Sequence, residues 1–296
     1  MGAGSYVPVG YYFDWNDAVN YGAGTINAKL FQQLGLVVTN FSIAKKVNPR
    51  FSLGGGLELI YGNIEYKANK AVVNSGIPFG DYTWNYKSDC DGIGLEGIFG
   101  ILFKATDKLS FGSVYRTGSS IELKGKADTN LSLAGLVENS DFKQEFHHPS
   151  SWGLGLAYTP KPKLSLTIDW QRTNWSEFKI DVDYNTEGVA LIDKNYSADW
   201  KDSNRYRLGV EYRPTKNWVL RGGYFFDESP LPDKSVSFSN IADLDRHNLT
   251  LGAGYQWKNG WQFDFLYAYS WGDRKTNGVD YSQKINGFGI QVTRKI

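Results

Sequence analysis

The sequence of 296 residues holds a single cysteine, a single methionine and three histidines. Because Cys90 has no second cysteine to pair with, the small disulfide-stabilised scaffolds are excluded. No apolar run reaches the roughly 18 residues that a membrane-spanning helix needs, so a helical membrane protein is excluded. The 32 basic and 31 acidic residues are interspersed and leave a net charge of +1, so no basic surface indicates a nucleic-acid partner.

Aromatic residues and glycine are abundant instead. Aromatics make up 16% of the chain, with 19 tyrosines, 17 phenylalanines and 10 tryptophans, and there are 33 glycines. Transmembrane β-barrels need aromatic side chains for the two girdles at the membrane surfaces. The mean hydropathy of −0.41 is compatible with such a barrel, because alternate residues of each strand face a wet interior and dilute the average.

A period of two residues dominates the hydrophobic pattern. Every odd position from Trp261 to Trp271 is aromatic, whereas the even positions are small, polar or aliphatic. This alternation is typical of a strand with two different faces and is incompatible with one face of a helix. We expect the aromatic face to contact lipid and the face with Gln262, Asp264 and Ser270 to point inward.

Short and long connectors alternate between the predicted strands. The short ones, such as 46–50 and 213–217, carry tight-turn residues, and long ones cover about 15–33, 66–91, 124–145, 182–200, 228–245 and 273–283. The pattern predicts a single all-β domain over residues 1–296. We expect a closed antiparallel up-and-down transmembrane β-barrel of about 12 strands, with short periplasmic turns and long extracellular loops. The strands are predicted near 6–13, 34–45, 51–66, 92–104, 109–123, 146–158, 163–181, 201–213, 217–227, 246–257, 261–272 and 284–295.

The N-terminal residues Met-Gly-Ala-Gly-Ser contain neither a basic segment nor an apolar segment, so they do not form a secretory signal. A barrel of the outer membrane has to be exported. We therefore expect the sequence to be a mature, truncated or engineered form.

No motif predicts catalysis, a metal or another cofactor. Gly92 to Gly97 matches the dinucleotide pattern G-x-G-x-x-G, but a strand follows it where a helix is required. The His147-His148 pair has no third ligand nearby in sequence, so a zinc site is not predicted. Four carboxylates share one parity and are read as a polar inner wall rather than a hydrolytic pair: Asp169, Glu177, Asp181 and Asp183. We expect a protein that is not an enzyme.

Two groups of residues are candidates for ligand binding. Apolar side chains in the predicted loops can capture a hydrophobic ligand or pack as loop cores, and both interpretations stay open. On the inner face of the predicted barrel, three arginines can bind a carboxylate or form salt bridges with Glu211 and Asp169. The loop candidates are Val72, Val73, Ile77 and Phe79 in one loop and Leu131, Leu133 and Leu136 in the other; the arginines are Arg205, Arg207 and Arg221.

Several sequence blocks resemble one family. They include Pro149 to Tyr158, Arg205 to Tyr212, Asn217 to Tyr224, Asp245 to Tyr255 and, most specifically, Asp227-Glu-Ser-Pro-Leu-Pro232. Over residues 35–296 the chain resembles the FadL-type family of outer-membrane transporters for long-chain fatty acids and hydrocarbons. Compared with that family's 14 strands, the chain is expected to lack the N-terminal plug and about two strands. It also ends in Ile296 rather than an aromatic residue.

The resemblance implies a passive uptake channel for hydrophobic small molecules, either long-chain fatty acids or hydrocarbons. Ligand would be captured at the extracellular loops and would pass through the barrel. The alternative is a general-diffusion or structural barrel without a dedicated ligand. We expect a monomer in the bacterial outer membrane that contacts outer-membrane lipid and, during insertion, the barrel-assembly machinery.

Overall fold

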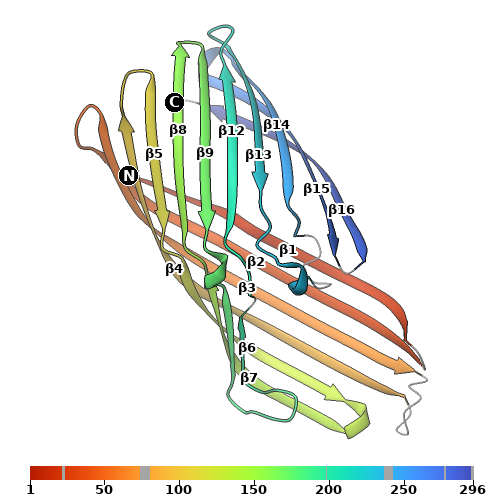
Figure 1. The fold of residues 1–296 in the computed structure, drawn as a ribbon. Coiled ribbons are helices and arrows are strands. Elements are labelled where there is room, and N and C mark those ends of the chain that lie inside the picture. Colours follow the sequence, from red (N-terminus) through yellow and green to blue (C-terminus); the bar gives the residue numbers. More distant parts are fainter. Residues whose placement is uncertain (22–23, 74–80, 198, 237–242, 277, 295–296) are drawn as a thin grey trace.

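The fold is one antiparallel sheet of sixteen strands, with short 3₁₀ helices between some of them (Figure 1). The computed structural model describes residues 1–21, 24–73, 81–197, 199–236, 243–276 and 278–294. No helix in these ranges is long and apolar enough to cross a membrane. The prediction of an antiparallel all-β fold is therefore confirmed.

The first four strands are the longest and run through the whole molecule. They have 20 to 23 residues each: β1 (Gly2–Tyr21), β2 (Gly24–Lys46), β3 (Phe51–Val73) and β4 (Tyr82–Lys104). At a rise of roughly 3.3 Å per residue, such strands extend about 65–75 Å. A tilted strand needs only about 9–11 residues to cross a bilayer. These four strands therefore continue well beyond any membrane that they cross.

Eight further strands form four crossings of the sheet, and each crossing is interrupted so that it consists of two successive strands. They are β5 (Leu109–Arg116) with β6 (Ser119–Leu131), β7 (Leu136–His148) with β8 (Ser151–Lys161), β9 (Leu164–Thr173) with β10 (Lys179–Tyr184), and β11 (Lys194–Ser197) with β12 (Ser203–Tyr212). The register aligns Arg116 with Ser151, Ser151 with Thr173, and Thr173 with Ser203, so the interruptions lie side by side. We call this row, formed by residues 117–118, 149–150, 174–178 and 199–202, the break line.

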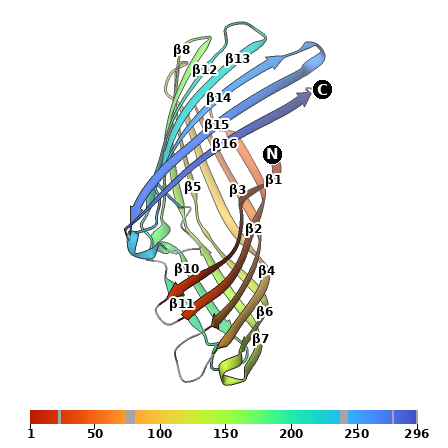
Figure 2. The same ribbon diagram turned by 90° about the vertical axis from the view of Figure 1, so that its right-hand side faces the viewer.

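The last four strands are not interrupted. They are β13 (Trp218–Asp227), β14 (Arg246–Gln256), β15 (Trp261–Thr276) and β16 (Val279–Arg294). Among the described residues, β1 pairs with β2 alone and β16 with β15 alone. The two chain ends lie at the same end of the molecule (Figure 2). Closure of the sheet into a ring stays a prediction.

The predicted count of about 12 strands was wrong, because the break line divides crossings that the hydrophobic pattern shows as continuous. Gly118 has a φ of +73°, and a side chain there would meet the His148 carbonyl oxygen at 2.6 Å. Pro149 in the next crossing has no N–H to donate to the ladder. Both residues end the pairing in the middle of a crossing.

The long loops predicted at 15–33, 66–91, 124–145 and 273–283 were also wrong in large part. Apart from residues 22–23, 74–80 and 277, which are not described, these ranges form mainly strand hairpins. Their polar residues alternate with buried ones, as on β6, where Glu122, Lys124 and Lys126 alternate with Ile121 and Leu123. Polar outer faces are what a sheet needs once it has left the membrane.

The outer face of the sheet changes character at the break line. On β3 and β4 the outward residues are apolar up to Tyr61 and Ile93 and polar beyond them, beginning with Asn63 and Asp91. We call the part with the apolar outer face the membrane half; it contains β5, β8, β9 and β12–β16 and the adjoining parts of β1–β4. The remainder, with β6, β7, β10 and β11, is the outer half (Figure 1).

The hydrophobic core lies inside the outer half. There the sheet curls on itself, so that Tyr86 on β4 and Tyr184 on β10 place their hydroxyl oxygens 3.2 Å apart although β6 and β7 lie between them in the sheet (Figure 2). Side chains from five strands and one connector fill the concave face: Leu36, Val38, Ile60, Cys90, Ile121, Leu123, Ala127, Phe142 and Leu191. We call the concave side of the whole sheet the inner face.

Candidate functional site

The inner face of the membrane half is lined by small residues. Register and strand parity place one glycine after another on this face, with serines and threonines among them. Two hollows of about 600 and 450 Å³ lie over this lining. A wall that projects so few large side chains leaves room inside the curved sheet. The glycines are Gly54, Gly100, Gly112, Gly153, Gly155, Gly209, Gly223, Gly252 and Gly289.

The three predicted arginines do lie on this inner face, as their parity indicated. Arg221 on β13 is held by two carboxylates, Glu211 and Asp264, each at 2.9 Å. Arg205 on β12 is paired with Asp227 in the opposite position of β13. Arg221 thus has the predicted partner Glu211, whereas Arg205 pairs with Asp227 in place of the predicted Glu211 or Asp169.

Arg207 has a different environment. Its Nη2 donates to the amide oxygen of Gln171 at 2.9 Å, and Asp169 lies opposite it in the register of β9 and β12. The partner that its guanidinium directly hydrogen-bonds is therefore neutral. Of the three arginines, Arg207 is the one best able to accept a further anionic partner.

A buried charged group lies where the two halves meet. Glu58 on β3 is 2% exposed and accepts hydrogen bonds from the Arg116 guanidinium on β5, from Asn40 at 3.0 Å and from the Tyr6 hydroxyl at 3.3 Å. A carboxylate can be buried so deeply only when a cation and further donors satisfy it. These contacts tie β1, β2, β3 and β5 together on the inner face.

A second buried acid lies beside the first. Glu96 on β4 is 3% exposed and stands opposite Glu58 in the register of β3 and β4. The Nδ1 atom of His148 is 3.7 Å from Glu96 Oε2, which is too long for a hydrogen bond. With Arg116 these residues form a band of ionisable groups between the membrane half and the apolar core.

An aromatic cluster lies at the break line. Phe178 stacks on Trp200 with ring centroids 4.4 Å apart, and Trp175 meets Trp200 edge-on at 5.3 Å. Phe146 on the inner face of β7 joins the cluster through an edge contact with Phe178 at 5.2 Å. Residues 174–178, which include the 3₁₀ helix η2 (Trp175–Glu177), and residues 199–202 supply Trp175, Phe178 and Trp200 because both segments leave the strands at the same level. It forms an apolar patch next to the charged band.

The block that carried the sequence resemblance is folded inward nearby. Residues 230–232 are buried, and the Lys201 N–H donates to the Pro230 carbonyl at 2.8 Å. Arg274 holds the block through the Leu231 carbonyl and, at 2.8 Å, through the Asp233 carboxylate. These contacts hold the start of the connector between β13 and β14 in place as part of the wall at the break line.

The structure separates the predicted loop residues from the arginines. Val72 is buried on β3 opposite Tyr82, and Leu131 ends β6 opposite Trp84, so both lie near the tips of the outer half. Val73 ends β3, Leu136 begins β7, and Leu133 is exposed in η1 (Ser132–Ala134); Ile77 and Phe79 lie outside the described residues. The arginines belong to β12 and β13 in the membrane half.

Sequence reasoning missed the buried charged group, the aromatic cluster and one further group of side chains. Glu145, His147 and Asp181 come together on the outer face of β7 and β10. Asp181 was expected on the inner wall with Asp169, but the break at 174–178 reverses the parity between β9 and β10. The sequence does contain a signal for the burial of Glu58, because Glu58 is two residues from the apolar Ile60 and therefore lies on the same face of β3.

A sequence profile of known outer-membrane proteins matches residues 1–293, and its description is outer membrane protein transport protein (OMPP1/FadL/TodX). The chain belongs to this family. The expected resemblance and the outer-membrane location are thereby confirmed.

Curated relatives of the FadL/TodX family are distant. The long-chain fatty acid transport protein of Escherichia coli O6:H1 is 24% identical over 86% of this chain and 63% of its own length. Outer membrane protein P1 of Haemophilus influenzae is 22% identical over 91% of this chain and 62% of its own length. The chain thus spans less than two thirds of the length of these two relatives.

Solved structures show the same fold. A Pseudomonas aeruginosa FadL homologue superposes with a TM-score of 0.71 at 21% identity, over 98% of this chain and 72% of that chain. The toluene transporter TbuX of Ralstonia pickettii gives a TM-score of 0.67 at 16% identity, over 94% and 79% of the two chains. At these identities the likeness establishes architecture alone.

Proposed function

We propose that this FadL/TodX-family chain is a passive outer-membrane uptake channel for hydrophobic small molecules, either long-chain fatty acids or hydrocarbons. The observation that carries the proposal is the order in which three surfaces follow one another along the inner face. An apolar core in the outer half leads to the aromatic cluster and then to the roomy small-residue wall of the membrane half. Relatives named as fatty acid and toluene transporters support the same function.

The proposal includes closure of the sheet into one transmembrane domain over residues 1–296. The open edges of β1 and β16 run antiparallel to each other, because β1 starts and β16 ends at the end of the molecule with the short turns (Figure 1). Lipid offers no hydrogen-bond partner to such edges. We also propose that the chain works as a monomer and is inserted by the barrel-assembly machinery.

Binding of an apolar ligand is stabilised by contact with the apolar residues of the outer half. Burial contributes roughly 0.8 kcal/mol for each CH₂ group of an acyl chain. We propose that the ligand makes its first contact with Val72, Val73, Leu131, Leu133 and Leu136 at the tips of the outer half, together with Ile77 and Phe79, which lie outside the described residues. Passage past the charged band then requires that some of its contacts open.

The function is tested by comparing two kinds of transport in vesicles that contain the purified protein. We expect transfer of a radiolabelled long-chain fatty acid or of toluene, with little conductance to small ions in the absence of ligand. Replacement of Trp200 by alanine should weaken binding of the apolar ligand about two- to tenfold, because one stacking partner of Phe178 is lost.

The matched control is Trp152→Ala, which removes the same side chain from the outer face of β8. It should leave ligand binding unchanged. High ion conductance combined with no transfer of apolar compounds would instead establish the alternative, a general-diffusion or structural barrel.

A second experiment distinguishes a fatty acid from an uncharged hydrocarbon. If the ligand is a fatty acid, Arg207→Ala should weaken its binding about 10- to 100-fold, because a charge-assisted hydrogen bond is lost. The methyl ester of the same acid should bind to both proteins within about twofold. Binding of the acid and of its methyl ester to both proteins is measured by isothermal titration calorimetry in detergent.

Arg221→Ala serves as the comparison, because Arg221 is already held by Glu211 and Asp264. We expect a smaller effect there on the acid than at Arg207. Equal affinities of wild type and Arg207→Ala for the acid would exclude Arg207 as its partner and would favour a hydrocarbon ligand.

A further inference from the structure

Three carboxylates face one another across the outer surface of the outer half. The register places Glu122 on β6 opposite Glu145 on β7, and Glu145 opposite Asp181 on β10. Like charges directly opposite one another destabilise a sheet unless a cation lies between them. Glu122 has such a partner in Lys124 at 2.7 Å. Glu145 and Asp181 share a different neighbour, His147.

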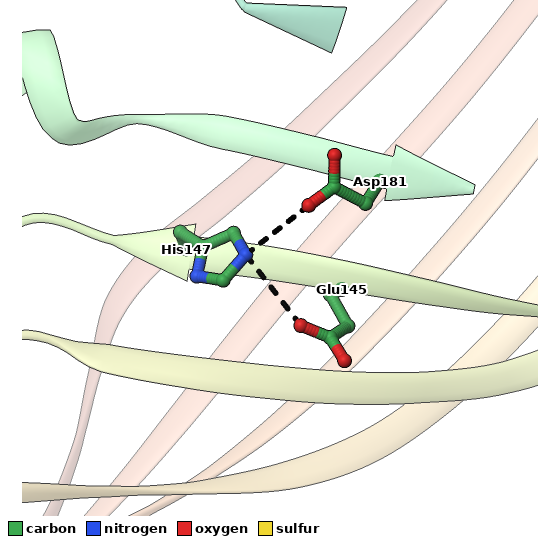
Figure 3. Close-up of side chains that lie close together, drawn as sticks. All are labelled: Glu145, His147 and Asp181. Atoms are coloured by element: carbon green, nitrogen blue, oxygen red, sulfur yellow. Dashed lines mark ion pairs between the residues drawn. The ribbon is translucent and has the colours of Figure 1, made fainter. Parts of the chain in front are cut away.

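His147 lies two residues after Glu145 on the same face of β7 and points between the two acids (Figure 3). Its Nε2 atom is 3.5 Å from Glu145 Oε2 and 3.5 Å from Asp181 Oδ2. One ligand atom from each of the three side chains lies within 4.8 Å of the others. A nitrogen and two carboxylate oxygens thus converge on one small volume.

The spacing fits tetrahedral coordination. Zinc binds histidine nitrogen and carboxylate oxygen at roughly 2.0–2.2 Å, which separates the ligand atoms of a tetrahedron by about 3.3–3.6 Å. The two distances of 3.5 Å that involve His147 lie in this range. The side chains are between one third and one half exposed, so a fourth ligand can come from solvent.

We propose that Glu145, His147 and Asp181 bind a divalent cation of the zinc class on the outer face of the sheet. Neutral His147 would supply Nε2, and the two carboxylates would supply one oxygen each. The positive charge of the ion offsets the repulsion between Glu145 and Asp181. The site adds a link between β10 and β7, which are already paired in the sheet, and so strengthens the attachment of the β10–β11 hairpin to β7.

The test is zinc binding by the full chain, purified without a polyhistidine tag and titrated with zinc chloride in detergent. We expect one zinc ion per chain. His147→Ala, Glu145→Gln and Asp181→Asn should each weaken binding about tenfold or more, since each removes one ligand. Cobalt bound at the same site should show the strong visible absorption of a tetrahedral complex, and this absorption should be lost in His147→Ala.

Asp183→Asn is the matched control, because Asp183 follows Asp181 on the same face of β10 without belonging to the cluster. It should bind zinc as wild type does. The unfolding midpoint without zinc shows whether each variant folds. Absence of zinc binding by the wild type, or equal affinity in His147→Ala, would overturn the proposal.

Discussion

Replacement of Arg116 by methionine is expected to lower the free energy of unfolding by about 3–5 kcal/mol. The reason is that Glu58, which is 2% exposed, would keep its charge in a buried place without a cation. Tyr6 and Asn40 still donate hydrogen bonds to this carboxylate, but both are neutral. Urea unfolding of the protein in lipid vesicles, followed by tryptophan fluorescence, measures the loss.

Two further variants identify the cause of that loss. The double variant Glu58→Gln/Arg116→Met removes the buried charge together with its partner, so most of the stability should return. Arg213→Met removes an exposed arginine whose partner Glu211 keeps Arg221, and it should cost less than about 1 kcal/mol. A loss below about 1 kcal/mol in Arg116→Met would show that Glu58 is not buried as a charge.

The membrane half could be predicted from the sequence because two different media act on its two faces. On β15 the aromatic positions from Trp261 to Tyr269 alternate with Gln262, Asp264 and Ser270, and Asp264 does bind the inner-face Arg221. On β12 the outward Tyr206 and Leu208 are exposed at the surface that lipid would cover. Because one face of such a strand contacts lipid and the other contacts water, its own residues show which face points outward, and the neighbouring strands need not be known.

The outer half was misjudged because its strands have polar outer faces. From Ile121 to Thr129 exposed residues alternate with buried or partly buried ones, but the exposed residues are all charged. The period of two is present in the sequence here as well, but its exposed positions are charged instead of apolar. What distinguishes such a hairpin from a loop is the buried parity, not the overall polarity.

The candidate sites could not be predicted because they depend on register across several strands. Arg116 reaches Glu58 across β4, and the register of β3, β4 and β5 decides their proximity. His147 meets Asp181 only because residues 174–178 reverse the parity of β10 relative to β9. A local pattern shows on which face of its own strand a side chain lies, whereas an offset between distant strands is set by turns and breaks.

Replacement of Phe265 by arginine is expected to destabilise the protein by about 2–4 kcal/mol if the residue lies near the middle of the membrane. Phe265 is 56% exposed on the outer face of β15, beside the outward Leu251 and Ala253 of β14. A guanidinium at this position would have to enter hydrocarbon or draw water and headgroups toward it.

Leu266 provides a sharp control for this prediction. It is the next residue, it is similarly exposed at 48%, and its parity places it on the inner face with Asp264. Leu266→Arg should therefore cost less than about 1 kcal/mol, since water and the Asp264 carboxylate are available inside. Both free energies come from urea unfolding of the protein in lipid vesicles, where the outer face meets hydrocarbon. Equal costs for the two variants would mean that Phe265 does not face lipid, and a larger cost at Leu266 would mean that the inner and outer faces of the membrane half are reversed.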